Sequence, residues 1–146
     1  MVCPLSILEI RGKVFSDLSE QILFYSEKWY DNESFANNRG KVGWHLVRKT
    51  PVENSTDKTW DEQQALLAKN EEMPTALVMV YTIISHFLAT GERLFENVYV
   101  CCSDMISGGC RVCVGDFNAG GLSVVDYKNT DHGLISIAAS RLPEKL

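Results

Sequence analysis

The chain has 146 residues, of which 45% are hydrophobic, and its formal net charge is −5. This length and composition are typical of one globular domain with its own core, so we expect a single domain over residues 1–146. The acidic balance argues against a general nucleic-acid binder, because such proteins present a basic face to the phosphate backbone. We therefore expect no nucleic-acid partner.

We expect no targeting signal in the amino-terminal residues. Met1–Pro4 lacks the basic and apolar segments of a secretory leader, and the second residue is not the glycine that myristoylation requires. The apolar run at residues 75–90 is shorter than the roughly 20 residues that span a bilayer, and it contains Thr82, Ser85 and His86. We therefore expect a cytoplasmic protein that makes no membrane contact.

The front of the chain predicts a strand, a helix, a loop and a second strand. We expect the first strand at Leu5–Arg11. Apolar side chains at helical spacing then predict a helix over residues 17–30, with Ser16 as its N-cap. The asparagines and glycine of residues 31–41 indicate a loop. Alternating side chains over residues 42–50 predict a strand, which the following proline ends.

A capping box predicts the next helix. Thr59 and Glu62 have the spacing at which a hydroxyl and a carboxylate each bond a free backbone N–H of the first helical turn. The helix is expected to continue to about Lys69. Residues 51–58, which precede it, are polar and indicate a connecting segment.

The clearest helix signal lies in the middle of the chain. Pro74 and Gly91 bracket an apolar run and predict one long helix over residues 75–90. Proline suits the first turn because it has no N–H, and glycine suits the left-handed position that follows a helix. Apolar side chains cover most of this helix, and a narrower polar stripe contains Thr82 and His86.

The residues after this helix predict an antiparallel meander with glycine-rich turns. The expected strands are Asn97–Cys102, Cys110–Phe117 and Leu122–Tyr127. We predict the register in which Cys102 faces Cys110, because it places six small side chains on one face. They are Val98, Val100, Cys102, Cys110, Val112 and Val114. Leu134–Ala139 is expected to form a fourth strand, with a helix as the alternative.

Together these elements predict an α+β fold. It consists of an antiparallel β-meander packed against a long central helix, with two further helices in the N-terminal half. Helices that precede a run of strands do not suit a doubly wound parallel sheet.

The cysteines raise the question of a metal site. Cys110 and Cys113 have the spacing of a zinc half-site, and Cys101 and Cys102 supply two more sulfurs. In the predicted register these sulfurs lie on opposite faces of the sheet, so one ion cannot collect all four. Zinc would again fit if residues 110–113 formed a turn. We predict no metal and no cofactor, and interpret the cysteines as small buried hydrophobic residues.

The chain contains no catalytic sequence signature, so the candidate site residues are single side chains. The candidate catalytic groups are His86, Arg93 and Asp126. The candidate ligand-binding residues are Thr82, Tyr99 and Trp44. The alternative interpretation of His86 is a histidine at the solvent edge of its helix or bonded to a backbone carbonyl.

Two classes of function fit these observations. The first is a small non-catalytic binding or regulatory module, because the second face of the sheet is partly apolar and must be covered. Its partner would be a small molecule, a protein or a second copy of the chain in a homo-oligomer. The alternative is a small enzyme with a pocket between the central helix and the sheet, in which His86 acts with a carboxylate from the meander. The two differ in whether a pocket at His86 contains a second titratable group.

Overall fold

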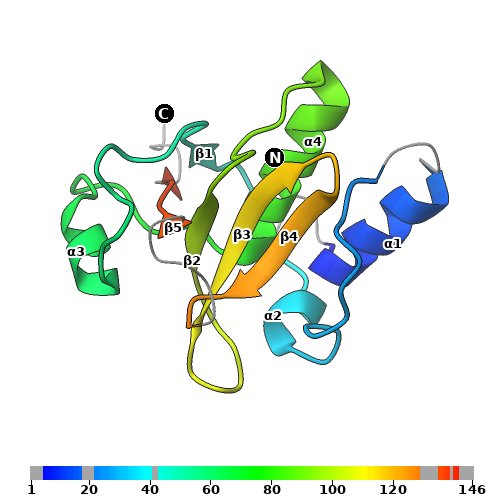
Figure 1. Cartoon of the computed structure of the whole chain (residues 1–146), viewed down its shortest axis with the longest axis horizontal. Coiled ribbons are helices and arrows are strands. Elements are labelled where there is room, and N and C mark those ends of the chain that lie inside the picture. Colours follow the sequence, from blue (N-terminus) through cyan, green and yellow to red (C-terminus); the bar gives the residue numbers. More distant parts are fainter. Residues whose placement is uncertain (1–4, 18–21, 41–42, 129–134, 139, 142–146) are drawn as a thin grey trace.

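The computed structural model describes residues 5–17, 22–40, 43–128, 135–138 and 140–141. Within them the helices are α1 (Ile7–Asp17), α2 (Ser34–Asn37), α3 (Trp60–Ala65) and α4 (Ala76–Thr90). The strands are β1 (Leu46–Val47), β2 (Tyr99–Met105), β3 (Arg111–Asn118), β4 (Gly121–Asp126), β5 (Ile135–Ser136) and β6 (Ser140–Arg141). Figure 1 shows α4 behind the sheet, with α1 and α2 on one flank and α3 on the other. This arrangement confirms the predicted α+β class.

The larger sheet has the strand order β4-β3-β2-β5. β2, β3 and β4 pair antiparallel as consecutive hairpins, which confirms the predicted meander. The predicted fourth strand at residues 134–139 is represented by β5, which pairs parallel with β2 and so does not continue the meander. β6 pairs with β1 in a separate two-stranded sheet. Residues 134 and 139 themselves lie outside the described residues.

The predicted register of the first hairpin is wrong by two residues. Val100 pairs with Val114, not with Val112 as predicted. Cys102 therefore does not face Cys110, which lies outside β3. Because side chains alternate with a period of two, an error of two residues leaves the predicted faces intact. Five residues of the predicted set belong to the face toward α4: Val100, Cys102, Val112 and Val114 are buried in the core cluster, and Val98 is partly buried against the same cluster.

A bulge in β2 separates two registers within this hairpin. Between Cys101 and Met105, β2 has three residues, whereas β3 has one residue between their two partners. The bulge removes Ser103 from the ladder, and its backbone groups find other partners. The Ser103 N–H donates to the Pro74 carbonyl at 2.9 Å, and the Ser103 carbonyl accepts from Arg111 Nη1 at 2.7 Å. The bulge thus joins β2 to the segment that precedes α4.

The central helix occupies the predicted range. Thr75 is its N-cap, with the side-chain hydroxyl oxygen accepting from the Val78 N–H at 3.2 Å, and Gly91 ends it with a φ of 76°. Pro74 precedes the N-cap instead of lying in the first turn. The buried residues of α4 are Ala76, Leu77, Val78, Met79, Val80, Ile83 and Ile84. No helix in the described parts of the chain has the length and apolar character needed to cross a bilayer.

Two predictions for the front of the chain are wrong. Most of the segment predicted as a strand at Leu5–Arg11 belongs to α1, which begins at Ile7 because Ser6 and Glu9 form a capping box. The Glu9 N–H donates to Ser6 Oγ at 3.1 Å, and the Ser6 N–H donates to Glu9 Oε1 at 3.3 Å. The helix predicted at residues 17–30 is not formed over residues 22–30, where the chain runs beside β4. The Ser6 and Glu9 spacing is the same signal that predicted α3.

The other front-half predictions hold in part. The predicted capping box at the start of α3 is formed, but this helix ends at Ala65 and not near Lys69. The strand predicted at residues 42–50 shortens to β1. The loop predicted at residues 31–41 contains the four-residue helix α2. Residues 41–42 lie outside the described residues.

The outer edge of β4 is covered by the segment at residues 23–25. The Leu122 N–H donates to the Leu23 carbonyl, and the Leu122 carbonyl accepts from the Tyr25 N–H, both at 2.9 Å. Phe24, between them, is buried in the core. An exposed strand edge is a template for unwanted pairing, so this segment closes the sheet on that side.

Beyond residue 25 the backbone no longer pairs with the edge of β4, and two side chains bond that edge instead. The Val124 N–H donates to Glu27 Oε1 at 2.8 Å, and the Val124 carbonyl accepts from Trp29 Nε1 at 2.8 Å. Burial raises the pKa of the Glu27 carboxyl above its ordinary value of 4.5, although the Val124 N–H bond opposes the shift. The carboxylate therefore completes the ladder at an electrostatic cost to the folded state.

This cost predicts a pH dependence. When the folded-state pKa of a carboxyl is raised, the folded state holds its proton longer, so stability falls as pH rises from the ordinary value through the raised one. As pH rises through that window, the free energy of unfolding of the wild type is expected to fall relative to that of Glu27→Gln. Urea unfolding of both proteins at several pH values measures this difference. Glu62→Gln is the control with the opposite slope, because the Thr59 backbone N–H lowers the pKa of Glu62. Parallel curves for wild type and Glu27→Gln would contradict the prediction.

Candidate functional site

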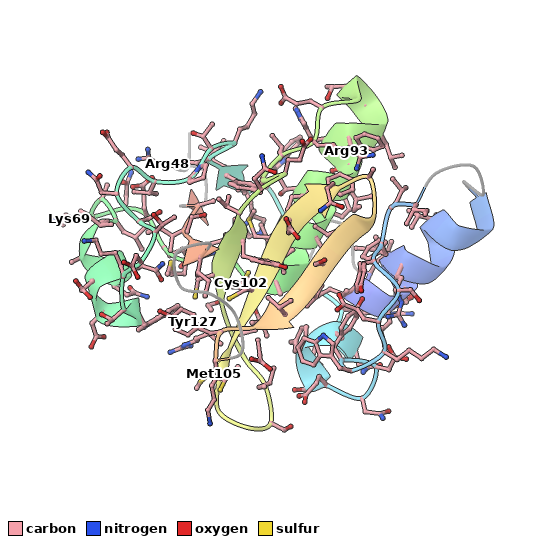
Figure 2. The ribbon with its side chains drawn as sticks, viewed as in Figure 1. Arg48, Lys69, Arg93, Cys102, Met105 and Tyr127 are labelled. Carbon is pink, nitrogen blue, oxygen red and sulfur yellow. The ribbon has the colours of Figure 1, made fainter. Side chains whose placement is uncertain are left out.

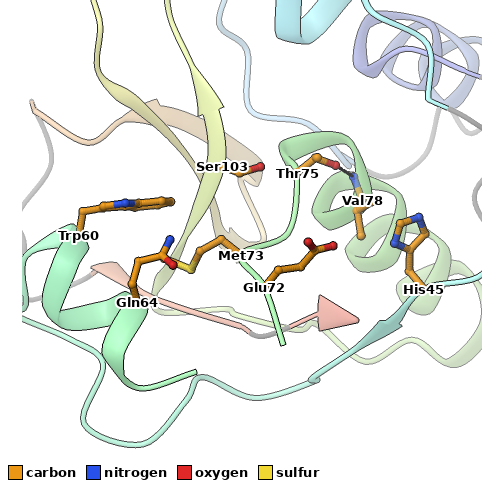
Figure 3. Close-up of a pocket in the computed structure, with 8 residues that line it drawn as sticks. All are labelled: His45, Trp60, Gln64, Glu72, Met73, Thr75, Val78 and Ser103. Atoms are coloured by element: carbon orange, nitrogen blue, oxygen red, sulfur yellow. Dashed lines mark hydrogen bonds between the residues drawn. The ribbon is translucent and has the colours of Figure 1, made fainter. Parts of the chain in front are cut away.

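A pocket of about 270 Å³ lies between α3, the segment before α4, and the bulge of β2 (Figure 3). Its lining residues are His45, Trp60, Gln64, Glu72, Met73, Thr75, Val78 and Ser103. They come from distant parts of the sequence, so the pocket exists only in the folded chain. In Figure 3, Trp60 and Gln64 stand on one side of the space and Val78 and His45 on the other.

The bulge in β2 positions the sheet side of the pocket. It turns Ser103 out of the ladder, so that this residue lines the cavity. Bulges frequently re-aim a side chain in this way beside functional sites. Arg111 then fixes the geometry, since it binds the Ser103 carbonyl and its guanidinium carbon lies 4.0 Å from the centre of the Trp60 ring. One side chain thereby holds two walls of the pocket in place.

The short helix α3 is anchored from beneath by a buried amide. Gln63 is fully buried, and its Nε2 donates to the Ser55 carbonyl at 3.0 Å and to the Ile135 carbonyl at 3.4 Å. Because Gln63 points inward, its neighbour Gln64 faces the pocket. The capping box fixes the start of the same helix, where Trp60 is the first residue. The α3 side of the pocket is therefore held at two points.

The start of α4 forms the third side. Asp104, which follows Ser103 in the bulge, accepts a hydrogen bond from the Ala76 N–H at 2.6 Å. Burial raises the pKa of the Asp104 carboxyl, and the Ala76 N–H opposes that shift. A carboxylate is favourable at a helix N-terminus, so Asp104 fastens α4 to β2 next to the pocket.

Most polar groups of the pocket are not used by the fold. Within the described residues, five lining groups have no hydrogen-bond partner. They are the Glu72 carboxylate, the His45 imidazole, the Gln64 side-chain amide, the Ser103 hydroxyl and the Trp60 indole N–H. Met73 and Val78, in contrast, are buried and apolar. An apolar floor with a few uncommitted polar groups is the usual composition of a small-molecule site.

The candidate catalytic residues are dispersed. His86 Nε2 lies 2.7 Å from Glu92 Oε1, and Lys49 Nζ lies 3.7 Å from the same oxygen. Glu92 belongs to the loop after α4 and not to the meander. The bond to His86, followed by the charge of Lys49, lowers the pKa of Glu92. This surface cluster already pairs its charges with one another.

Arg93 and Asp126 lie far apart. Arg93 stacks on Phe87 and Phe117, at 4.6 and 4.7 Å from the ring centres. Asp126 pairs with Val112 in the ladder between β3 and β4. In Figure 2, Arg93 and Tyr127, the residue after Asp126, lie at opposite ends of the sheet. The two candidates therefore cannot act on one small substrate.

The candidate ligand-binding residues are also separate. Thr82 is half-buried on α4, and Trp44 is 62% exposed. The Tyr99 hydroxyl donates to Asp116 Oδ2 at 3.4 Å. None of the three lines the pocket described above, although His45, the neighbour of Trp44, does.

The cysteines follow the predicted alternation. Cys102 faces α4, whereas Cys101 and Cys113 lie in a second apolar cluster on the other face. In the described part of the chain, no group of three or more His, Cys, Asp or Glu side chains is placed to hold a metal ion.

A second pocket of about 320 Å³ lies between α1 and α4. It is lined by Leu5, Ile10, Lys13, Val14, Tyr81, Ile84, Ser85 and Leu88. The Ser85 hydroxyl already donates to the Tyr81 carbonyl within α4. This pocket offers apolar surface but few polar groups that would orient a ligand.

Comparison of this chain with protein-family models, curated proteins and solved structures gives no match. Its function is therefore argued from the site alone.

Sequence reasoning missed most of this site. Neither Glu72 nor Trp60 is among the candidate site residues that the sequence predicts. The turn glycines and the alternation of β2 gave no sign that Ser103 leaves the ladder. The one signal in the sequence was the density of polar residues beside Trp60 and Pro74.

Proposed function

We propose that this protein is a non-catalytic binding module for a small organic amine. The single observation that carries the proposal is the pocket with an apolar floor and five uncommitted polar groups. Met73, Val78 and the Trp60 ring would contact an apolar or aromatic part of the ligand. The hydroxyl of Ser103 and the amide of Gln64 would bond polar groups beside it.

The charge of the lining selects the ligand class. Among the described residues that line the pocket, Glu72 is the one acidic residue, and none is Lys or Arg. Its carboxylate lacks an ion-pair partner within the described residues. An ammonium group on the ligand would supply that partner, and charge-assisted hydrogen bonds are stronger than neutral ones. An anionic ligand would meet repulsion at the same place.

A binding role is better supported than the enzyme alternative. The enzyme alternative required His86 beside a carboxylate of the meander in one pocket. His86 is paired with Glu92 instead, and neither pocket described above includes it. We also propose a reducing, cytoplasmic location, which the free thiols of Cys101, Cys102 and Cys113 support.

Binding is tested with 2-phenylethylamine and its anionic counterpart 3-phenylpropionate as probes. The indole N–H signal of Trp60, assigned with Trp60→Phe, is followed by NMR during titration. The amine is expected to shift this signal, and the carboxylate is not. Equal responses to both probes, or no response of Trp60, would overturn the proposal.

Glu72→Gln tests the charge itself. Loss of one charge-assisted hydrogen bond is expected to weaken amine binding about tenfold. Glu96→Gln, in the exposed loop before β2, is the matched control and should bind like the wild type. Native mass measurement of the purified protein reports both a retained ligand and the subunit count, which also tests the predicted homo-oligomer.

A further inference from the structure

Cys101 and Cys113 stand directly opposite each other in the hairpin of β2 and β3. Both side chains are fully buried, and both thiols are free. The other described cysteines are placed differently. Cys102 points to the opposite face of the sheet, and Cys110 lies outside β3.

The hydrogen-bond pattern fixes which kind of pair they form. The Asp116 N–H donates to the Val98 carbonyl at 2.9 Å, so those two residues form a hydrogen-bonded pair. Pairs alternate along an antiparallel ladder, which makes Cys101 and Cys113 a non-hydrogen-bonded pair. In such a pair the Cα atoms are about 4.5 Å apart and the side chains approach closely. That separation lies within the range of about 4.4–6.8 Å that a disulfide needs.

The two thiols already interact. The neighbouring Cys101 thiol and burial together raise the pKa of the Cys113 thiol. As ladder partners, the two residues project their side chains to the same face of the sheet, where both belong to one apolar cluster. No rearrangement of the strands is needed to bring them together.

We propose that Cys101 and Cys113 form a redox pair that a peroxide closes into a cross-strand disulfide. One thiol loses its proton, and its sulfur attacks a peroxide oxygen. The O–O bond breaks, the departing hydroxide takes the proton to form water, and a sulfenic acid remains. The second thiol then attacks that sulfur, so that the S–S bond forms, the S–O bond breaks and a second water leaves. Two thiols and one hydrogen peroxide thus give one disulfide and two waters.

The disulfide would lie directly behind the pocket. Met73 belongs to the same apolar cluster as the two cysteines, and Trp60 packs against that cluster. Closing the bond would fix β2 to β3 beside the bulge that carries Ser103. The redox pair itself does not depend on any ligand.

The test uses the folded protein with hydrogen peroxide at pH 8.5, followed by alkylation of the remaining thiols under denaturing conditions. Trypsin cleaves after Arg111, which leaves Cys113 as the one cysteine of peptide 112–128. Peptide 94–111 contains Cys101, Cys102 and Cys110. Mass spectrometry is expected to find these two peptides linked, with the loss of two hydrogens.

Three variants assign the bond. Cys102→Ala and Cys110→Ala are expected to retain the linked peptides. The disulfide closes a loop in the chain, so the oxidised protein is expected to have a Tm roughly 5–10 °C above that of the reduced protein. Cys101→Ala, checked for folding by circular dichroism, should lose the link. The proposal is overturned if Cys113 stays fully alkylated after peroxide treatment, or if the link disappears in Cys102→Ala or in Cys110→Ala.

Discussion

Gly121→Ala is expected to lower the free energy of unfolding by about 3–4 kcal/mol. Gly121 has a φ of 102°, a region that costs an L-residue roughly 1–2 kcal/mol. A Cβ atom there would also lie 2.4 Å from the Phe24 carbonyl carbon and 2.6 Å from the Tyr25 nitrogen. The covering segment must then move away from β4. Its two backbone hydrogen bonds to Leu122 would be lost, at about 1 kcal/mol each.

Gly120→Ala is the matched control for this substitution. Its Cβ would meet the flexible side chain of Asn118 at 3.1 Å, and no backbone atom lies as near. Because Gly120 is exposed, its substitution should change stability by less than about 1 kcal/mol. Urea unfolding of both variants measures the difference. A Gly121→Ala protein as stable as Gly120→Ala would show that the segment at residues 23–25 does not depend on this close approach.

The sequence predicted those elements whose signals are local. Thr75 and Gly91 act on the ends of α4 through bonds within one turn, so the helix could be placed from residues 74–91 alone. The turn glycines act in the same way, since Gly109 and Gly121 both have positive φ where the hairpins turn. The capping box at Ser6 is an equally local signal, so the start of α1 could have been predicted in the same way.

The segment before α2 could not be predicted because its structure is tertiary. Residues 22–30 have apolar side chains at helical spacing, but the chain satisfies its hydrogen bonds on the edge of β4. Nothing within the segment indicates that Glu27 and Trp29 will complete a ladder formed about one hundred residues later. Tertiary partners override a helical pattern of this strength.

The site was unpredictable for a related reason. The bulge in β2 depends on Pro74 and Arg111, which reach Ser103 from two other segments. The alternation of side chains along β2 predicted correctly which residues share a face of the sheet. It could not predict the extra residues that the bulge inserts into β2. Glu72 then becomes a site residue only because α3 and the bulge lie on either side of it.

Phe117→Ala is the second substitution with a large expected effect, a loss of about 3–5 kcal/mol in the free energy of unfolding. Phe117 is fully buried, and its ring meets Phe87 edge-on at 5.3 Å between centres. Truncation leaves a cavity between α4 and β3 that the rigid sheet cannot fill. The measurement is urea unfolding monitored by circular dichroism.

Arg93 provides the internal comparison for this cluster. Its guanidinium covers both rings and donates to the Asn118 carbonyl at 2.8 Å, which explains the residue without catalysis. Arg93→Ala should cost about 1 kcal/mol, because cation–π contacts at partly exposed sites are weak. The double variant with Phe117→Ala should lose less than the sum of the two, since the ring that Arg93 covers is already gone. Strict additivity would mean that the contact with Phe117 contributes nothing to stability.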